Sequence, residues 1–235
     1  MKKSSIREIK ERFDNDVERF SNLDTGQVAT IDAKISLELL TEAAKRIKPN
    51  AQNLLDIGCG AGNYSLKMLS KIADLNCTLV DLSKPMLEKA QERVSGKTNK
   101  PVKTVQGDFQ EIDLKENSFD IILAGAVLHH LRDDKDWETA FNKLYSLLKP
   151  GGCLMISDLI TQEINAVNEY TWERYGDYLE SVDGKGYRRK VFDYIEKEDS
   201  PRSMTYQLEL MKKVGFKKTE ILHKNMCFGT FGGVK

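Results

Sequence analysis

The sequence has no net charge, because its 36 lysine and arginine residues equal its 36 aspartate and glutamate residues. A balanced charge argues against a broad electrostatic contact with nucleic acid or anionic lipid. No stretch approaches the roughly 20 apolar residues that span a bilayer, and residues 1–10 are charged and lack the apolar region of a secretory signal. We therefore expect a cytoplasmic protein that makes no membrane contact and acts on a small or neutral partner. The sequence leaves open whether it works as a monomer or a homodimer.

Cysteine is scarce, and its positions exclude the usual cysteine sites. The four cysteines are scattered, form no C-x-x-C pair and lie in or beside apolar runs: Cys59, Cys77, Cys153 and Cys227. A thiol in such a place behaves as a small hydrophobic side chain. We predict neither a disulfide framework nor a bound metal.

What the sequence does contain is an alternation of short apolar runs and helical patterns from residue 53 onward. Runs of the length and composition of strands occupy residues 54–57, 78–80, 102–105, 121–124 and 154–156. A helix beginning at Ser200-Pro201 and ending at Gly215 precedes two further strands, at 216–222 and 227–234. This order predicts an α/β fold, a Rossmann-like doubly wound sheet of seven strands that is mainly parallel with the last strand antiparallel.

Helices are expected on both sides of this region. Apolar residues recur at helical spacing at Ile6, Ile9, Phe13, Val17 and Phe20, and again at Ile35, Leu39, Ala43 and Ile47. The segment 159–202 is helical in pattern and rich in aromatics, which predicts a helical cap over the sheet. We expect one domain with amino-terminal helices (1–50), a ligand-binding core (51–158), the cap (159–202) and a closing helix and strands (203–235).

The sharpest motif is a strand that runs into a glycine-rich turn and then a helix, at residues 54–63. Glycines let the backbone approach a ligand closely and adopt positive φ. The competing interpretation, a dinucleotide-binding loop, requires a third glycine where this chain has Asn63. The strand also ends in an acid, Asp56, which suits a cationic ligand better than a pyrophosphate.

Acids follow the next two predicted strands as well. Asp81 closes the second strand, where a carboxylate can accept hydrogen bonds from both hydroxyls of a ribose. Asp108 follows the third, where it can accept from an adenine amino group while Phe109 covers the base. Three successive strand ends thus offer groups that fit three parts of one nucleoside.

These motifs resemble the class I S-adenosylmethionine-dependent methyltransferases. The resemblance rests on D-I-G-C-G-A-G at 56–62, V-D at 80–81, G-D-F at 107–109, L-H-H-L at 128–131 and L-K-P-G-G at 148–152. It implies an enzyme that binds S-adenosylmethionine and releases S-adenosylhomocysteine. The cofactor residues that it implies are Asp56, Gly58, Cys59, Gly60, Asp81, Leu82, Met86, Asp108, Phe109, Ala124, Gly125, Leu128 and His129.

Methyl transfer from a sulfonium needs alignment and desolvation more than covalent chemistry, because its leaving group is already activated. If the acceptor is a hydroxyl or an ammonium, a base would help, and His129 and His130 are the candidates. Both histidines could instead only pack or hydrogen-bond in the loop. For the acceptor pocket we single out Trp172 and Tyr175 of the cap, whose alternative role is core packing.

The chain also resembles the carboxy-S-adenosylmethionine synthase of transfer-RNA wobble-uridine modification, through Phe13-Asp14 and the ending at 226–229. That resemblance implies an arginine that binds an extra carboxylate, with Arg189 as its nearest counterpart and Arg188 and Arg202 as rivals. The main hypothesis is methyl transfer to oxygen, nitrogen, sulfur or carbon of a small molecule. The alternatives are an enzyme that makes or uses the carboxylated cofactor, a transfer-RNA methyltransferase, and a non-catalytic nucleoside-binding protein.

Overall fold

The structure is a computed structural model that describes residues 3–22 and 27–235. Residues 1–2 and 23–26, which the sequence analysis assigns to the amino-terminal helical part, lie outside the described residues. The strands are β1 (Asn53–Ile57), β2 (Asn76–Asp81), β3 (Val102–Gln106), β4 (Phe119–Gly125), β5 (Leu148–Leu159), β6 (Lys218–Asn225) and β7 (Phe228–Val234). The helices are α1 (Ile6–Asn15), α2 (Val17–Ser21), α4 (Ala33–Ile47), α5 (Asn63–Lys71), α6 (Lys84–Ser95), η1 (Leu128–His130), α7 (Asp134–Leu147), α8 (Asn165–Glu198) and α9 (Met204–Val214).

The seven strands form one sheet in the order β3-β2-β1-β4-β5-β7-β6, and β7 is antiparallel to both of its neighbours. The pairs β3-β2, β2-β1, β1-β4 and β4-β5 are parallel. This confirms the predicted sheet, although several strands extend beyond the apolar runs that predicted them. The strand order reverses between β1 and β4, and in open α/β sheets ligands bind at such a point, outside the carboxyl ends of the strands.

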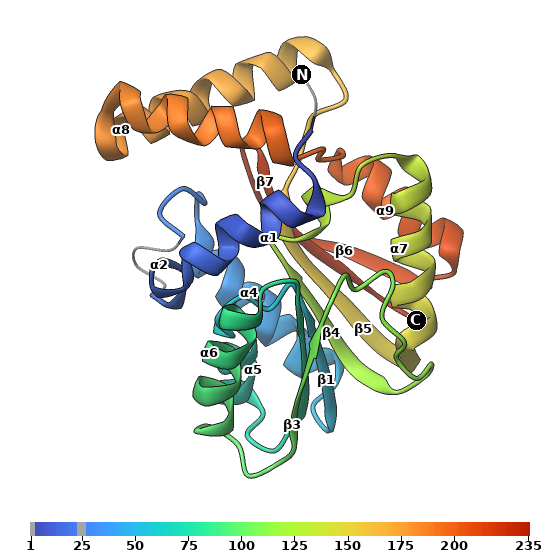
Figure 1. Ribbon diagram of the computed structural model, residues 1–235. Helices are drawn as coiled ribbons and strands as arrows, with labels where there is room; N and C mark the ends of the chain where they lie inside the picture. The colour runs from blue at the N-terminus through green and yellow to red at the C-terminus, as the bar shows by residue number, and fades with distance from the viewer. Residues whose placement is uncertain (1–2, 23–26) are drawn as a thin grey trace.

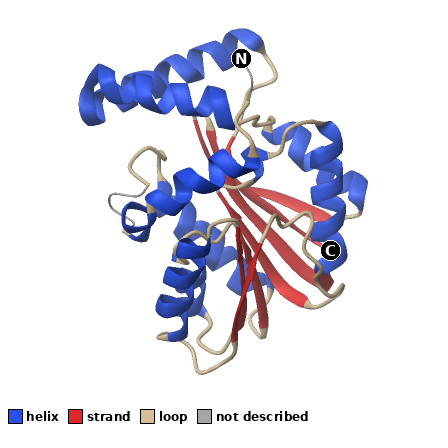
Figure 2. Cartoon of the chain, in the orientation of Figure 1, coloured by secondary structure: helices blue, strands red, loops and turns tan. Residues whose placement is uncertain are grey.

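Side chains of successive strand residues enter two separate cores, one on each face of the sheet. Ile122 and Ala124 of β4 pack with α7 and α9, whereas Ile121 and Leu123 pack with α4, α5 and α6. Figure 1 and Figure 2 show these two helical layers on either side of the sheet. Because both faces are covered, the central strands are apolar throughout, as a parallel sheet requires.

The cap lies beyond one end of the strands (Figure 1). Its long helix α8 is interrupted at Asp183 and Gly184, where Gly184 has φ +73, so that its two halves fold back against each other. A third core joins the halves to Leu159 of β5, and its most buried aromatic is Tyr175. The amino-terminal helix α1 lies between the cap and the sheet. Within residues 3–22 and 27–235, every helix is too short or too polar to cross a lipid bilayer.

Two details of the helical prediction were wrong. The first helix is broken at Asp16, which has φ −112 and ψ 16, so α1 and α2 are separate. On α4 the face containing Ile35, Leu39 and Ile47 is exposed, and the adjacent face with Leu37 and Leu40 packs against the sheet side. The spacing alone could not distinguish these faces, since both are apolar.

The second error concerns α9, which begins at Met204 rather than at Ser200-Pro201. Ser203 caps it, because the Ser203 hydroxyl accepts a hydrogen bond from the Tyr206 N–H. The preceding residues are held in an extended connection instead, since the Ser200 N–H donates to the His129 carbonyl and Thr161 pairs with Ser203 as a β-bridge.

Candidate active site

The glycine-rich turn after β1 is fixed by its own backbone contacts. Gly58, Gly60 and Gly62 all have positive φ, between +50 and +83. The Gly60 N–H donates to Asp81 Oδ2 at 2.8 Å, and the Ser83 N–H donates to Asp81 Oδ1 at 2.9 Å. The carboxylate that ends β2 therefore holds the turn that ends β1. A methyl group added at Gly58 would lie 2.5 Å from Val127 Cγ2, so glycine is required there.

Asp56 lies buried beneath the turn. Its Oδ2 accepts hydrogen bonds from the Ser65 hydroxyl at 2.6 Å and the Ser65 N–H at 3.2 Å. Burial outweighs these bonds and raises the pKa of Asp56 to about 7. Burial also raises the pKa of Asp81, against the backbone hydrogen bonds of Ser83 and Gly60. Both acids thus lie where a cationic or hydroxyl-bearing ligand would stabilise their ionised forms.

A further carboxylate reaches this site from the amino-terminal helices. Asp14 of α1 is held by Lys10, whose Nζ donates to Asp14 Oδ2 at 2.7 Å. Its other oxygen, Oδ1, is buried without a hydrogen-bond partner among the described residues. Burial would raise the pKa of Asp14, but the neighbouring Lys10 and Ser83 side chains outweigh it and lower the pKa. Sequence reasoning quoted Asp14 only within a resemblance, since nothing in the sequence places α1 over β2.

The end of β3 and the end of β4 complete the predicted cofactor residues. Asp108 Oδ1 accepts from the Gln110 N–H at 2.9 Å, and Phe109 and Met86 are buried. Gly125 faces the ring of Tyr64, with no room for a side chain. The other predicted residues occupy the same strand ends: Cys59 and Ala124 are buried, Leu82 is half-buried and Leu128 lies in the core beside α7.

These residues fit an adenosyl sulfonium cofactor by two observations. A methyl group added at Gly60 would meet no heavy atom of the described residues within 4 Å, apart from its chain neighbours, so the turn faces open space there. The acids at the ends of β1, β2 and β3 supply acceptors for an ammonium, hydroxyls and an amino group.

His129 lies at the other end of the site, held from both sides. The backbone N–H of His129 donates to Asp158 Oδ2 at 3.1 Å, and the ring Nδ1 hydrogen-bonds Asp158 Oδ1. Its Nε2 lies 3.8 Å from Asp199 Oδ1. Burial alone would lower the pKa of His129, but the two carboxylates outweigh it and raise the pKa to about 9. Both ring nitrogens of His129 thus face acids.

His130 lies beside it, with the two rings 4.3 Å apart. Its Nδ1 approaches Asp199 Oδ1 at 3.1 Å but without hydrogen-bonding geometry. Burial and the neighbouring His129 lower the pKa of His130. The ring of Phe13 packs edge-on against His130 at 6.0 Å, which brings α1 to this end of the site too.

An ion pair that the sequence did not predict joins α1 to the end of α8 beside these histidines. Arg12 of α1 donates from Nε and Nη2 to the carboxylate of Glu198, at 2.6 to 2.9 Å, and lies over the rings of Phe13 and Tyr194. The Glu198 side chain is only 8% exposed. The two residues are 186 positions apart, so no local pattern could have paired them.

The predicted acceptor residues of the cap lie in different surroundings. Tyr175 is buried and donates from its hydroxyl to the Ala29 carbonyl at 2.9 Å, while Trp172 packs beside it and donates to Asn168. Among the arginines, Arg189 is exposed, Arg188 pairs with Asp177 and Glu180, and Arg202 pairs with Asp134. The aromatics therefore build the core of the cap, and their role toward an acceptor stays a prediction.

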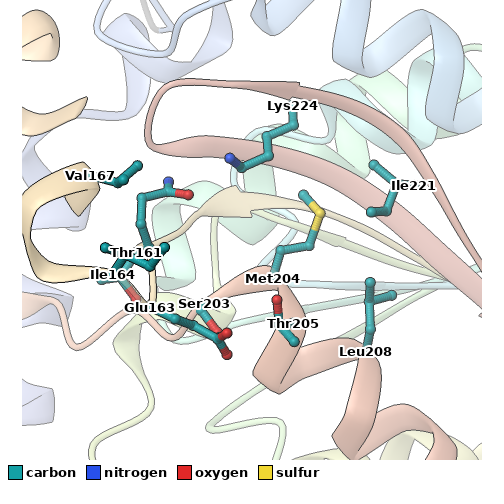
Figure 3. Close-up of a pocket in the computed structure, with 11 residues that line it drawn as sticks. Thr161, Glu163, Ile164, Val167, Ser203, Met204, Thr205, Leu208, Ile221 and Lys224 are labelled. Atoms are coloured by element: carbon teal, nitrogen blue, oxygen red, sulfur yellow. The ribbon is translucent and has the colours of Figure 1, made fainter. Parts of the chain in front are cut away.

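A separate hollow of about 340 Å³ opens between the start of α8, α9 and β6 (Figure 3). Its lining is mostly apolar, with Met204, Leu208 and Ile221 on one side and Ile164 and Val167 on the other. Its lining includes none of the predicted cofactor residues, so we do not place the reaction there.

Comparison with known proteins places these features in a family. Residues 54–152 match a family described as "Methyltransferase domain". The chain is 26% identical over 200 residues to a carboxy-S-adenosyl-L-methionine synthase of Vibrio atlanticus, covering 82% of this chain and 80% of that protein. It is 32% identical over 171 residues to a malonyl-[acyl-carrier protein] O-methyltransferase of Halalkalibacterium halodurans, covering 72% of this chain and 59% of that protein.

A solved structure confirms the fold over the whole chain. The N-methyltransferase NodS from Bradyrhizobium japonicum, in complex with S-adenosyl-L-homocysteine, superposes with a TM-score of 0.66 at 14% identity, covering 99% of each chain. The sheet order, the glycine-rich turn and the family match agree with one another. The family match and these similar proteins support a class I S-adenosylmethionine-dependent methyltransferase.

Proposed function

We propose that this enzyme transfers the methyl group of S-adenosylmethionine to an oxygen, nitrogen, sulfur or carbon atom of a small molecule held between the strand ends and the cap. The observation that carries the proposal is the row of acids at the ends of three adjacent strands, Asp56, Asp81 and Asp108. They lie on one side of a site whose other side is formed by α1, η1 and the end of α8.

Each part of the cofactor has a partner in this arrangement. Asp81 would accept from the ribose hydroxyls, and the unpartnered oxygen of Asp14 offers a second acceptor there. Asp108, Phe109, Leu82 and Met86 would surround the adenine. Gly58, Cys59 and Gly60 would contact the methionine and ribose portions. Asp56, Ala124 and Gly125 would lie near the methionine amino group, and Leu128 and His129 near the methyl group.

The chain's contribution to methyl transfer would be alignment and exclusion of water. The cofactor supplies the activated methyl group. The cap and α1 would orient the acceptor in line with the sulfur and keep water out, which is a large part of what such a displacement needs. Trp172, Tyr175 and Arg189 stay predicted acceptor residues, and a role of His129 or His130 as a base stays a prediction.

The whole chain would form one domain in which each part has its own role. The core (51–158) would bind the cofactor, the amino-terminal helices (1–50) and the cap (159–202) would enclose the acceptor, and the closing elements (203–235) complete the sheet. Balanced charge favours a small acceptor over transfer RNA. For the carboxylated-cofactor alternative, Arg188 and Arg202 already pair with acids, whereas Arg189, the nearest counterpart, is exposed.

Mass spectrometry of the adenosyl ligand retained by the freshly purified protein tests the cofactor. S-adenosylmethionine or S-adenosylhomocysteine is expected. Release of S-adenosylhomocysteine is then followed against a panel of small hydroxyl, amine, thiol and carbon acceptors, and turnover with one of them is expected. Retention of the carboxylated cofactor would favour the alternative instead. No adenosyl ligand at saturating supply would overturn the proposal.

A further inference from the structure

Three groups with lone pairs converge where η1 meets the end of the cap. They are His129, His130 and Asp199, and one ligand atom from each lies within 4.8 Å of the others. His130 Nδ1 lies 3.1 Å and His129 Nε2 3.8 Å from the same oxygen, Asp199 Oδ1. Ligands around a tetrahedral Zn²⁺ ion are separated by about 3.3 Å, given metal to ligand distances of about 2.0–2.2 Å.

The polar atoms of this cluster lack the partners that burial would require. Asp199 is 3% exposed, and neither of its carboxylate oxygens has a hydrogen-bond partner among the described residues. The same is true of His130 Nδ1. A buried carboxylate without hydrogen bonds is costly, so these atoms point to a ligand between them.

The surroundings resemble those of a metal-binding histidine. Asp158 hydrogen-bonds His129 Nδ1 and leaves Nε2 directed toward Asp199, and a carboxylate behind the ligating histidine orients the ring in the same way at metal sites. The charge also fits. Asp158 and Asp199 are buried carboxylates on either side of His129, Arg12 is already paired with Glu198, and Arg132 donates to the backbone carbonyls of Ser4 and Glu198. Lys3 Nζ donates to the backbone carbonyls of Glu196 and Asp199.

We propose that His129, His130 and Asp199 bind a divalent transition-metal ion of the Zn²⁺ class. Two imidazoles and one carboxylate are a ligand set that such ions accept, and three protein ligands leave a coordination position for a further oxygen or nitrogen atom. This departs from the sequence-based expectation of no metal, because the ligands come from residues 70 positions apart that only the fold brings together. It goes beyond the proposed function and does not depend on it.

The test is a Zn²⁺ titration by calorimetry of the full chain, freed of metal with a chelator and measured without cofactor. One Zn²⁺ per chain is expected. His130→Ala and Asp199→Asn should each weaken binding at least about tenfold, and Asp158→Asn about 10–100-fold. The matched control is His223→Ala, since His223 also pairs with a carboxylate, Asp32 at 2.8 Å, and is the one other histidine of the chain. Its affinity should not change.

A second measurement on the unaltered chain covers variants that fail to fold, as circular dichroism would show. X-ray absorption of the zinc-loaded protein should show nitrogen and oxygen ligands only. A sulfur shell at about 2.3 Å would assign the ion to the cysteines and overturn the proposal. No binding to the folded chain, or full binding to the folded His130→Ala, Asp199→Asn double variant, would also overturn it. Because cofactor is absent throughout, either result leaves the methyl-transfer proposal standing.

Discussion

The nucleoside end and the acceptor end of the site are held together over very different distances in the chain. At the nucleoside end Asp56 and Ser65 are 9 residues apart, and Gly60 and Asp81 are 21 apart. At the acceptor end His129 and Asp158 are 29 residues apart, and Arg12 and Glu198 are 186 apart. Residues that are close in the sequence form motifs that can be recognised from the sequence. The contacts of the proposed acceptor end form only when the cap and α1 pack onto the sheet.

The largest expected effect is a pH dependence that belongs to the nucleoside end. The pKa of Asp56 is raised from 3.8 to about 7 in the folded chain, so its stabilising contribution is complete below pH 4 and is lost as the pH rises through 7. The loss should be roughly 4 kcal/mol of the free energy of unfolding, at about 1.36 kcal/mol per pKa unit. Urea unfolding across this range measures it.

Asp56→Asn is the comparison for that experiment. Its free energy of unfolding should fall less between pH 4 and 7 than that of the parent chain. Saturating S-adenosylhomocysteine should also reduce the slope of the parent chain, since the ligand's ammonium favours the ionised carboxylate. Equal slopes for the parent and Asp56→Asn would contradict this account of Asp56.

At the acceptor end we expect Arg12→Ala to lower the free energy of unfolding by about 3 kcal/mol. The change leaves the buried Glu198 carboxylate without its partner, and breaking a buried pair in this way costs about 3–5 kcal/mol. The lower value applies because the Arg12 side chain is 26% exposed. Chemical denaturation measures it, and Arg12→Lys is the control that keeps the charge. A loss below 1 kcal/mol would mean that the pair does not fasten α1 to the cap.

Asp81→Ala tests the nucleoside end through its affinity for the cofactor product. We expect it to weaken binding of S-adenosylhomocysteine by about 1–3 kcal/mol, through lost charge-assisted hydrogen bonds. Calorimetry measures the affinity, and Asp14→Ala in the same assay reports whether α1 contributes to the ribose site. Unchanged affinity in Asp81→Ala would place the ribose elsewhere.

The smallest effect is expected within the cap. Tyr175→Phe removes the hydroxyl that donates to the Ala29 carbonyl and should cost about 1 kcal/mol of the free energy of unfolding. Tyr178→Phe is the matched control, because that hydroxyl donates to the Val28 carbonyl from a less buried position. If Tyr175 binds the acceptor instead, Tyr175→Phe should raise the KM for the acceptor while leaving the unfolding midpoint unchanged.

The same contrast explains what could be predicted from the sequence. The strand runs and the acids at their ends are local features, and the sheet and the family followed from them. The sequence could not show which face of α4 packs, because Ile35 and Leu37 are both apolar and only packing decides between them. Asp14, Arg12 and Asp199 were not identified as site residues, since each acquires its neighbours from a distant part of the chain.

The position of α1 carries a kinetic consequence. This helix is tied to the cap through Arg12 and Glu198, and the following helix is tied to the start of α5, where Asn63 Nδ2 donates to the Phe20 carbonyl at 2.8 Å. A cofactor bound beneath α1 could leave only after these bonds opened. If departure of the spent cofactor limits turnover, loosening either bond should speed the cycle while admitting more water to the site.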